Sequence, residues 1–310
     1  MEFKHISVLL NESVDALNIK KDGVYADGTL GGGGHSEKIL ERLSDKGLLI
    51  GIDRDIEAIE AAKERLKNYS NIIYENTNFK NIKEILQKND IKNIDGAVLD
   101  LGVSSYQLDN ADRGFSYIAS SRLDMRMDTS ASLDAYKVVN TYSEEELAKI
   151  FFEYGEEKFS RRIAAKIVEE RAKKPIETTL ELSELVKKCI PQKTVKKGSH
   201  PAKRVFQAIR IEVNGELDIL EGAINDFFDS LKSGGRLAII SFHSLEDRIV
   251  KNTFANLARG CVCPKDFPVC VCGQKPRGKI ITKKAVVPTE NEIEFNKRSK
   301  SSKLRVIEKI

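Results

Sequence analysis

Acidic residues and a run of glycines follow the first two predicted strands of this 310-residue chain. Asp27 leads into the run from Gly31 to Gly34, and Asp53 stands twenty residues after Gly33. Glycines let the backbone approach a ligand closely and adopt positive φ. An acid at a strand end can accept hydrogen bonds from both hydroxyls of a ribose. The spacing therefore predicts a nucleoside-binding loop, with Asp53 as the ribose acid.

The glycine run lacks the register of the common phosphate-binding loops. A dinucleotide fingerprint needs glycines at relative positions one, three and six, but Ser36 follows Gly31 and Gly33. A P-loop needs a lysine directly after its last glycine, where this chain has His35. An acid that leads into such a loop suits a ligand with an ammonium group and a ribose, and S-adenosylmethionine is such a ligand. The alternative is a tight turn that is merely rich in glycine.

Short apolar runs separated by amphipathic stretches predict an α/β fold around these residues. We expect strands over residues 24–27, 48–52, 71–74 and 95–101, and helices over residues 36–45 and 55–68. Such short connections are typical of a parallel sheet. Asp100 stands at the end of the fourth predicted strand, where ligands of α/β sheets bind.

Helix signals without a convincing strand follow this pattern. Ser143 with Glu146 and Thr178 with Glu181 read as capping boxes, each of which opens a helix. The alternation resumes only at residues 236–241, after a long helical pattern over residues 202–231. We therefore predict a helical insert over residues 109–201 within an α/β domain formed by residues 1–108 and 202–310.

Composition agrees with a globular chain whose charge is unevenly distributed. Apolar residues make up 41% of the sequence, and 51 basic against 47 acidic residues give a net charge of only +4. Residues 186–204 nevertheless contain seven basic residues and no acid, and residues 274–310 contain eleven against four glutamates. These segments could contact a phosphate backbone or could be solvated surface runs. No leader-like or membrane-spanning apolar stretch is present, so we expect a soluble, cytoplasmic protein without membrane association.

Six ordered blocks of this sequence resemble the bacterial RsmH (MraW) family. They include Asp27-Gly-Thr-Leu-Gly-Gly-Gly-Gly-His-Ser36 and Asp100-Leu-Gly-Val-Ser-Ser-Tyr-Gln107, and together they span residues 5–12, 27–36, 100–107, 123–128, 200–214 and 234–248. The resemblance implies a class I S-adenosylmethionine-dependent methyltransferase fold, Rossmann-like, with an inserted all-helical domain for substrate recognition. It also implies methylation of the exocyclic N4 of a cytidine in the decoding region of 16S ribosomal RNA. The small ribosomal subunit would be the partner, and a homodimer stays open.

The resemblance assigns cofactor-binding roles to seven residues. Asp53 would bind the ribose and Phe79 would lie near the adenine. The full set is Gly33, Gly34, His35, Asp53, Phe79, Asp100 and Gln107. Many relatives have a larger residue at the position of Gly32, and the glycine here should make the loop more flexible without removing a contact.

The group that accepts the amine proton is less clearly indicated. Because the lone pair of a cytosine amine is delocalised into the ring, catalysis must align the amine with the methyl donor and accept a proton. Asp100 is itself a catalytic candidate, because its carboxylate could accept a hydrogen bond from this amine or from the ammonium of the cofactor, and it is assigned to the cofactor first. The sequence Asp-Leu-Gly-Val-Ser-Ser departs from the acid or asparagine, two prolines and aromatic of DNA amino-methyltransferases. Candidates are Asp109, Asp124 and His243, each with a plain structural role as the alternative.

Other residues could present the target base. Unpaired RNA bases often stack on aromatic rings, and Tyr106, Phe115 and Phe242 follow predicted strands closely enough to supply such rings, although each also suits a core position. The basic segment 187–204 could hold the RNA backbone. Competing hypotheses are a methyltransferase that acts on DNA or protein, and a non-catalytic RNA-binding assembly factor.

Four of the five cysteines lie within twelve residues, at positions 261, 263, 270 and 272. Four thiols at this spacing could close a tetrahedral zinc site, although the side chains of a Cys-x-Cys pair diverge in an extended segment. Unligated thiols or a redox-sensitive pair are the alternatives. The sequence alone assigns none of these cysteines as a metal ligand.

Overall fold

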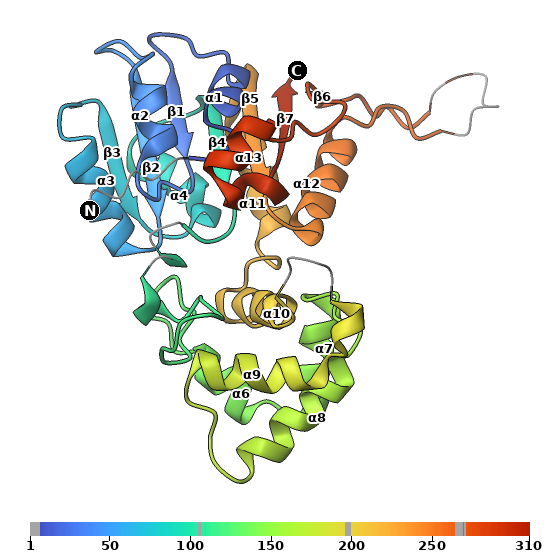
Figure 1. Ribbon diagram of the computed structural model, residues 1–310. Coiled ribbons are helices and arrows are strands. Elements are labelled where there is room, and N and C mark those ends of the chain that lie inside the picture. Colours follow the sequence, from blue (N-terminus) through green and yellow to red (C-terminus); the bar gives the residue numbers. More distant parts are fainter. Residues whose placement is uncertain (1–6, 105–106, 109, 196–199, 264–268, 270) are drawn as a thin grey trace. The chain divides into compact units, whose positions relative to one another are not determined.

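The N-terminal and C-terminal parts of the chain together form a seven-stranded mixed sheet (Figure 1). The computed structural model describes residues 1–310 except 1–6, 105–106, 109, 196–199, 264–268 and 270. The chain divides into two compact units, which are described separately below. The first, called the sheet unit, comprises Met1–Gly102 and Leu217–Ile310, and the second, called the helical unit, comprises Val103–Glu216.

The sheet has the strand order β3-β2-β1-β4-β5-β7-β6. Strands β1 to β5 run parallel, and β7 is antiparallel to both of its neighbours. Residues that are almost all buried form β4, as expected of a parallel strand covered on both faces. The bounds are β1 Val24–Asp27, β2 Leu48–Asp53, β3 Ile72–Asn76, β4 Ile94–Asp100, β5 Leu231–Ser241, β6 Gly278–Ile280 and β7 Lys303–Lys309. The predicted α/β pattern is confirmed, whereas β6 and β7 had no counterpart in the prediction.

Helices cover both faces of this sheet. One face packs apolar side chains of α4, α11 and α12 against the strands, and the other packs those of α1, α2 and α3. Helix α2 ends at Leu40, earlier than the predicted end at residue 45. The bounds are α1 Leu10–Ala16, α2 Gly34–Leu40, α3 Ile56–Arg65, η1 Phe79–Asn81, α4 Ile82–Lys88, α11 Leu220–Ser230, α12 Ser244–Leu257, α13 Glu290–Phe295 and η4 Lys297–Ser301.

The helical unit has a hydrophobic core of its own. Both predicted capping boxes are present, with Ser143 and Glu146 at the start of α7 and Thr178 and Glu181 at the start of α9. The bounds are η2 Ala111–Arg113, α6 Ala135–Thr141, α7 Glu144–Glu153, α8 Ser160–Arg171, α9 Thr179–Cys189, η3 Gln192–Thr194 and α10 Lys203–Asn214. Across the described ranges of both units, no helix is long and apolar enough to cross a membrane.

The long helical pattern over residues 202–231 is two helices and not one. Helix α10 ends where Gly215 adopts a left-handed conformation with φ 56°. Phe206 and Ile209 of α10 are buried in the core of the helical unit, whereas Phe227 of α11 is buried against the sheet. The helical unit therefore extends beyond the predicted insert, residues 109–201, at both ends.

Candidate functional site

Three acids of the sheet unit lie at the carboxyl ends of adjacent parallel strands. Asp27 ends β1, Asp53 ends β2 and Asp100 ends β4. Thr29 connects two of them, because its backbone N–H donates to Oδ1 of Asp27 (3.1 Å) while its Oγ1 accepts from the backbone N–H of Asp100 (2.6 Å). Ser36 donates its hydroxyl to Oδ2 of Asp27 (2.8 Å). Hydrogen bonds thus hold the residues on either side of the glycine loop to the strand ends.

Asp53 holds the opposite side of this loop. Its Oδ2 accepts a hydrogen bond from the backbone N–H of Gly31 (2.8 Å), and its Oδ1 accepts from that of Asp55 (2.9 Å). Burial raises the pKa of Asp53. Because a carboxylate oxygen can accept more than one hydrogen bond, both oxygens retain capacity for the paired hydroxyls of a ribose.

Two glycines of the run are required by the local geometry. Gly33 has φ 76° and is the N-cap residue of α2, a conformation that costs little only for glycine. Gly34 lies so close to Ser7 that a Cβ at residue 34 would stand 1.9 Å from Oγ of Ser7. The loop therefore brings backbone and not side chains to this edge of the sheet.

His35 and Asp100 approach each other beside the loop. His35 is buried, its Nε2 lies 3.2 Å from the carbonyl oxygen of Val8, and its Nδ1 lies 3.8 Å from Oδ2 of Asp100. Within the described part of the chain, the buried Oδ1 of Asp100 has no hydrogen-bond partner. A buried polar atom without a partner is costly and often marks a ligand position.

The strand ends carry more negative charge than the described residues neutralise. Burial, together with the charges of Asp27 and Glu246, raises the pKa of Asp100 well above its usual range. Burial likewise raises the pKa of Asp27 to about 6. No lysine or arginine in the described ranges forms an ion pair with Asp27, Asp53 or Asp100. Such an arrangement favours a ligand that brings positive charge.

Phe79 lies beside the same edge. It begins η1, and its Cβ would be 3.3 Å from a Cβ built on Gly28, the residue that follows β1. Its ring is partly buried against the core. The sheet unit therefore brings together six of the seven predicted cofactor residues. The seventh, Gln107, belongs to the helical unit, where its Oε1 accepts from the backbone N–H of Ser104 (3.1 Å).

Two of the three candidate proton acceptors have evident structural roles. His243 is the N-cap residue of α12, its Nδ1 accepts from the backbone N–H of Glu246 (3.4 Å), and its Nε2 lies 3.1 Å from Oε1 of Glu246. Asp124, in the helical unit, accepts two hydrogen bonds from the guanidinium of Arg126. Burial would raise the pKa of Asp124, but the bonds from Arg126 outweigh it and lower that pKa. Asp109 lies outside the described residues.

The aromatic residues considered for base stacking have different surroundings. Phe115 is buried in the core of the helical unit, so it is a packing residue there. Phe242 is partly buried against the sheet. Tyr106 lies outside the described residues. The described parts of the chain thus give the predicted stacking role little exposed aromatic surface at these positions.

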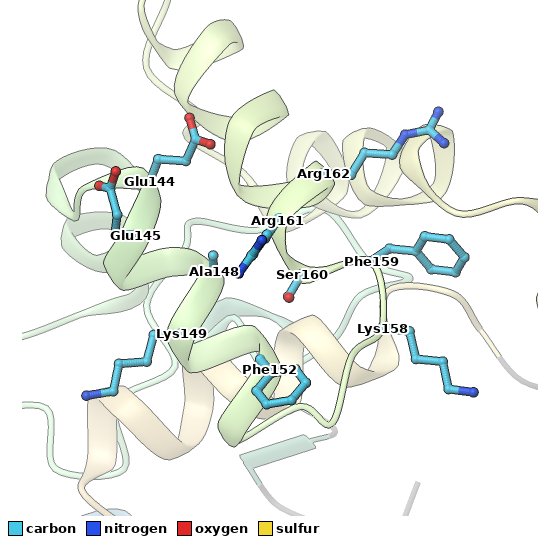
Figure 2. A pocket seen from close by; sticks show the side chains of 10 residues that line it. All are labelled: Glu144, Glu145, Ala148, Lys149, Phe152, Lys158, Phe159, Ser160, Arg161 and Arg162. Atoms are coloured by element: carbon cyan, nitrogen blue, oxygen red, sulfur yellow. The ribbon is translucent and has the colours of Figure 1, made fainter.

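The helical unit has a hollow of about 840 Å³ that the sequence did not indicate (Figure 2). Lys149 and Phe152 of α7 line it together with Lys158, Arg161 and Arg162 near the start of α8, and the acidic Glu144 and Glu145 of α7 line it as well. The ring of Phe152 is 65% exposed. None of the four cations forms an ion pair with any residue that the structure describes. An adjoining hollow shares Lys158 and Phe159 and is also lined by His200 and Arg204. We call the first hollow the α7–α8 hollow.

The two predicted basic segments are partly engaged in internal contacts. Lys187 pairs with Glu184 (3.3 Å), and Arg204 donates to the carbonyl oxygen of Glu156 (2.9 Å). Residues 196–199 lie outside the described part. In the second segment, Lys303 and Arg305 of β7 both pair with Asp247 of α12. Much of this charge therefore stabilises the fold.

Comparison with known proteins gives consistent matches over the whole chain. Residues 2–310 match the model of the MraW methylase family. The chain is 62% identical, over the full length of both proteins, to "Ribosomal RNA small subunit methyltransferase H" of Clostridium botulinum (strain Kyoto / Type A2), and 58% identical to the protein of that name from Clostridioides difficile (strain 630). A solved structure of an rRNA methylase from Streptococcus thermophilus is 13% identical with a TM-score of 0.44, covering 98% of each chain. Together with the sheet order, the family match confirms the predicted class I methyltransferase fold.

Proposed function

The chain belongs to the MraW methylase family, and from that premise we propose that it uses S-adenosylmethionine to methylate the exocyclic N4 of a cytidine in the decoding region of 16S ribosomal RNA. The names of the relatives support the small-subunit RNA as the substrate. The choice of N4 and of the decoding region rests on the resemblance in the sequence. The observation that carries the cofactor is the set of three acids at the strand ends, none of which pairs with a lysine or arginine of the described residues.

Each acid has a place in this proposal. When bound, the cofactor supplies an electrophilic methyl group on a positively charged sulfur, and it also carries an ammonium group. The unpartnered Oδ1 of Asp100 would accept a hydrogen bond from that ammonium, which would favour the ionised carboxylate and offset the cost of burial. Asp53 would hold the ribose hydroxyls, and Phe79 would lie beside the adenine.

The glycine loop and its neighbours would complete the cofactor site. The left-handed Gly33 and the absence of a side chain at Gly34 let the loop backbone pack against Leu66 and Ser7 and so hold its place beside the strand ends. His35 would help to orient Asp100 through its Nδ1. We also keep Gln107 in the proposed set, on the resemblance alone.

Methyl transfer to a cytosine amine then requires alignment and an acceptor for one proton. Among the three candidates, Asp124 is the weakest base, because Arg126 holds its carboxylate in the ionised form. His243 follows β5, whose residue Ile240 pairs with Asp100 of β4, so it belongs to the same edge of the sheet as the cofactor acids. We therefore favour His243 over Asp124, and Asp109 stays a candidate on the sequence alone.

We assign RNA contact in the helical unit to the α7–α8 hollow. Phosphate contacts from lysine and arginine supply most of the affinity of proteins for RNA, and exposed aromatic rings add base stacking. The hollow offers four such cations and the exposed Phe152. By contrast, Lys166 of α8 and Lys173, which follows the end of α8, are paired with Glu169 and Glu170.

The decisive experiment supplies S-adenosylmethionine and small ribosomal subunits that lack the modification, followed by nucleoside mass analysis. We expect N4-methylcytidine. Another methylated nucleoside would refute the choice of N4, and methyl transfer only to DNA or protein would favour the competing enzyme hypothesis. Cofactor binding without turnover on any subunit preparation would favour the assembly factor.

A further inference from the structure

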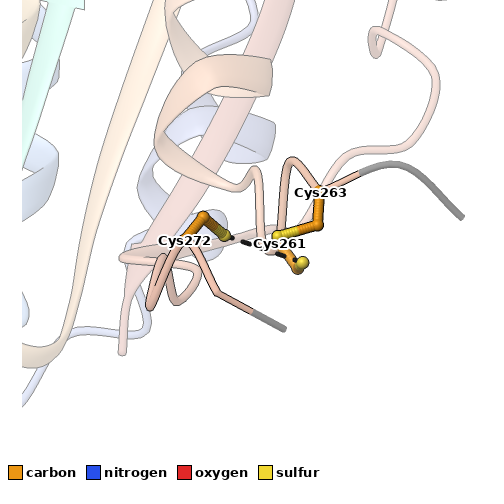
Figure 3. Close-up of side chains that lie close together, drawn as sticks. All are labelled: Cys261, Cys263 and Cys272. Carbon is orange, nitrogen blue, oxygen red and sulfur yellow. Dashed lines mark hydrogen bonds between the residues drawn. The ribbon is translucent and has the colours of Figure 1, made fainter. Parts of the chain in front are cut away.

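Three cysteine thiols gather in the segment between α12 and β6 (Figure 3). The sulfur atoms of Cys261, Cys263 and Cys272 all lie within 4.8 Å of one another. They belong to two stretches separated by residues 264–271, so a folded-back chain brings them together. Figure 3 shows the side chains of Cys261 and Cys272 directed toward each other.

The spacing of the sulfur atoms fits a shared metal ion better than a disulfide. The Sγ atoms of Cys261 and Cys272 are 3.6 Å apart, whereas bonded sulfur atoms are separated by about 2.05 Å. In a tetrahedral site with Zn–S bonds of about 2.3 Å, the sulfur atoms stand about 3.8 Å apart. The observed separation is therefore close to the edge of such a tetrahedron.

The side chains of a Cys-x-Cys pair diverge only when the segment is extended, and the backbone around these thiols is not extended. The chain bends at Cys263 instead of continuing extended. The backbone N–H of Val271 donates to Sγ of Cys263 at 3.4 Å. Hydrogen bonds of this kind orient metal-bound thiolates and spread their charge.

The segment has little else to hold it in this shape. A backbone hydrogen bond from Arg277 to Leu257 closes its neck (2.9 Å). Beyond the neck, no described residue of 258–277 contributes a buried apolar side chain. Val262, Val269 and Val271 are all more than half exposed. Short segments without a core usually need a metal or a disulfide to fold.

We propose that Cys261, Cys263 and Cys272 bind a structural zinc ion. Thiolates are soft ligands that favour zinc over magnesium or calcium, and cysteine-rich ligand sets are typical of structural zinc sites. Cys270, two residues before Cys272 in the sequence, lies outside the described residues. The proposal is independent of the methyl transfer proposed above.

The test is elemental analysis of the full-length protein after reconstitution with zinc and removal of excess metal. We expect about one zinc per chain, and almost none in the double variant Cys261→Ser/Cys272→Ser. The matched control is Cys189→Ala, because Cys189 is buried in the helical unit, and this variant should keep its zinc. Zinc absent from the wild-type protein, iron in its place, or zinc retained by the double variant would overturn the proposal.

A second measurement on the wild-type chain does not depend on the folding of variants. Alkylation followed by peptide mass analysis should show Cys261, Cys263 and Cys272 protected when zinc is bound and reactive after chelation. Cobalt substitution should add an absorption band from thiolate-to-metal charge transfer. Equal reactivity with and without zinc, or a disulfide in the non-reduced peptides, would contradict the site.

Discussion

The strand-end acids of the sheet unit and the α7–α8 hollow of the helical unit are opposite kinds of site. The first is largely buried, negatively charged and assembled from residues at the ends of three strands and from a glycine loop. The second is exposed, rich in cations and built from a single stretch, residues 144–162. A small charged cofactor requires particular groups at fixed points, whereas an RNA backbone requires only positive charge spread over a surface.

Of the changes that test this difference between the two sites, replacement of Asp100 should have the largest effect, and the quantity affected is cofactor affinity. If its carboxylate pairs with the cofactor's ammonium in a buried site, Asp100→Ala should lower cofactor affinity at least about 100-fold, because removal of one partner of a buried pair costs about 3–5 kcal/mol. Calorimetric titration with the cofactor and with its demethylated product measures this change. Glu60→Gln, on the exposed surface of α3, is the matched control and should bind normally. Unchanged affinity in Asp100→Asn would show that the charge is not needed.

Replacement of Asp27 tests whether its ionised, buried carboxylate lowers the free energy of unfolding of the ligand-free protein. Burial raises the pKa of Asp27 from 3.8 to about 6, so the folded protein binds the proton more tightly than the unfolded chain does. Stability should therefore fall as the pH rises from about 4 to about 6, and at pH 8 the ionised Asp27 costs about 3 kcal/mol.

Asp27→Asn removes this charge and should raise the free energy of unfolding at pH 8, with the gain shrinking as the pH falls toward 4. Urea unfolding without ligand at both pH values measures it. An equal gain at both pH values would assign the effect to packing and not to charge. Cofactor affinity of the same variant should decrease, since the site would attract a cation less strongly.

The backbone of the glycine loop gives a smaller effect. Gly33→Ala places a Cβ on a residue with φ 76° and should cost about 1–2 kcal/mol of stability. Gly222→Ala is the matched control, because Gly222 lies in α11 with open space around it, and this change should stabilise by up to about 1 kcal/mol. Thermal unfolding compares the two variants. A neutral Gly33→Ala would mean that the loop can refold around an alanine.

The two sites also differ in how much the sequence predicts of them. Asp27, Asp53 and Asp100 are predictable because each ends an apolar strand, and the ends of parallel strands meet at one edge. The break at Gly215 was missed, because only tertiary packing shows that α10 belongs to the helical unit and α11 to the sheet. Strand β7 is stabilised by its pairing with β5, a contact distant in the sequence.

The hollow was missed for a different reason. Phe151 and Phe152 are adjacent on α7, and the core takes Phe151 together with its other neighbour Ile150, which leaves Phe152 exposed. The cations of the hollow differ from several other basic residues of the helical unit in having no acidic partner in the described part of the chain. Lys158 and Arg161 form no ion pair with a glutamate among the described residues, whereas Lys166 of α8 and Lys173 just after it have glutamate partners three or four residues away. Residue type alone does not separate the two groups.

The difference between unpaired and ion-paired basic residues allows the most specific test, and its expected effect is the smallest of those described. Lys158→Ala/Arg161→Ala should weaken binding of small-subunit RNA several-fold and reduce the steepness of its salt dependence, by about 0.7–0.9 in the log–log slope for each lost phosphate contact. Lys166→Ala/Lys173→Ala removes the same net charge from ion-paired positions and should change both quantities less, because those lysines are already neutralised by glutamates. Binding measured at several salt concentrations separates the two double variants, and cofactor affinity should stay constant in both. If the paired and unpaired lysines lowered RNA affinity equally, net charge and not the hollow would carry the contact, and the helical unit would have no localised RNA site of the kind proposed.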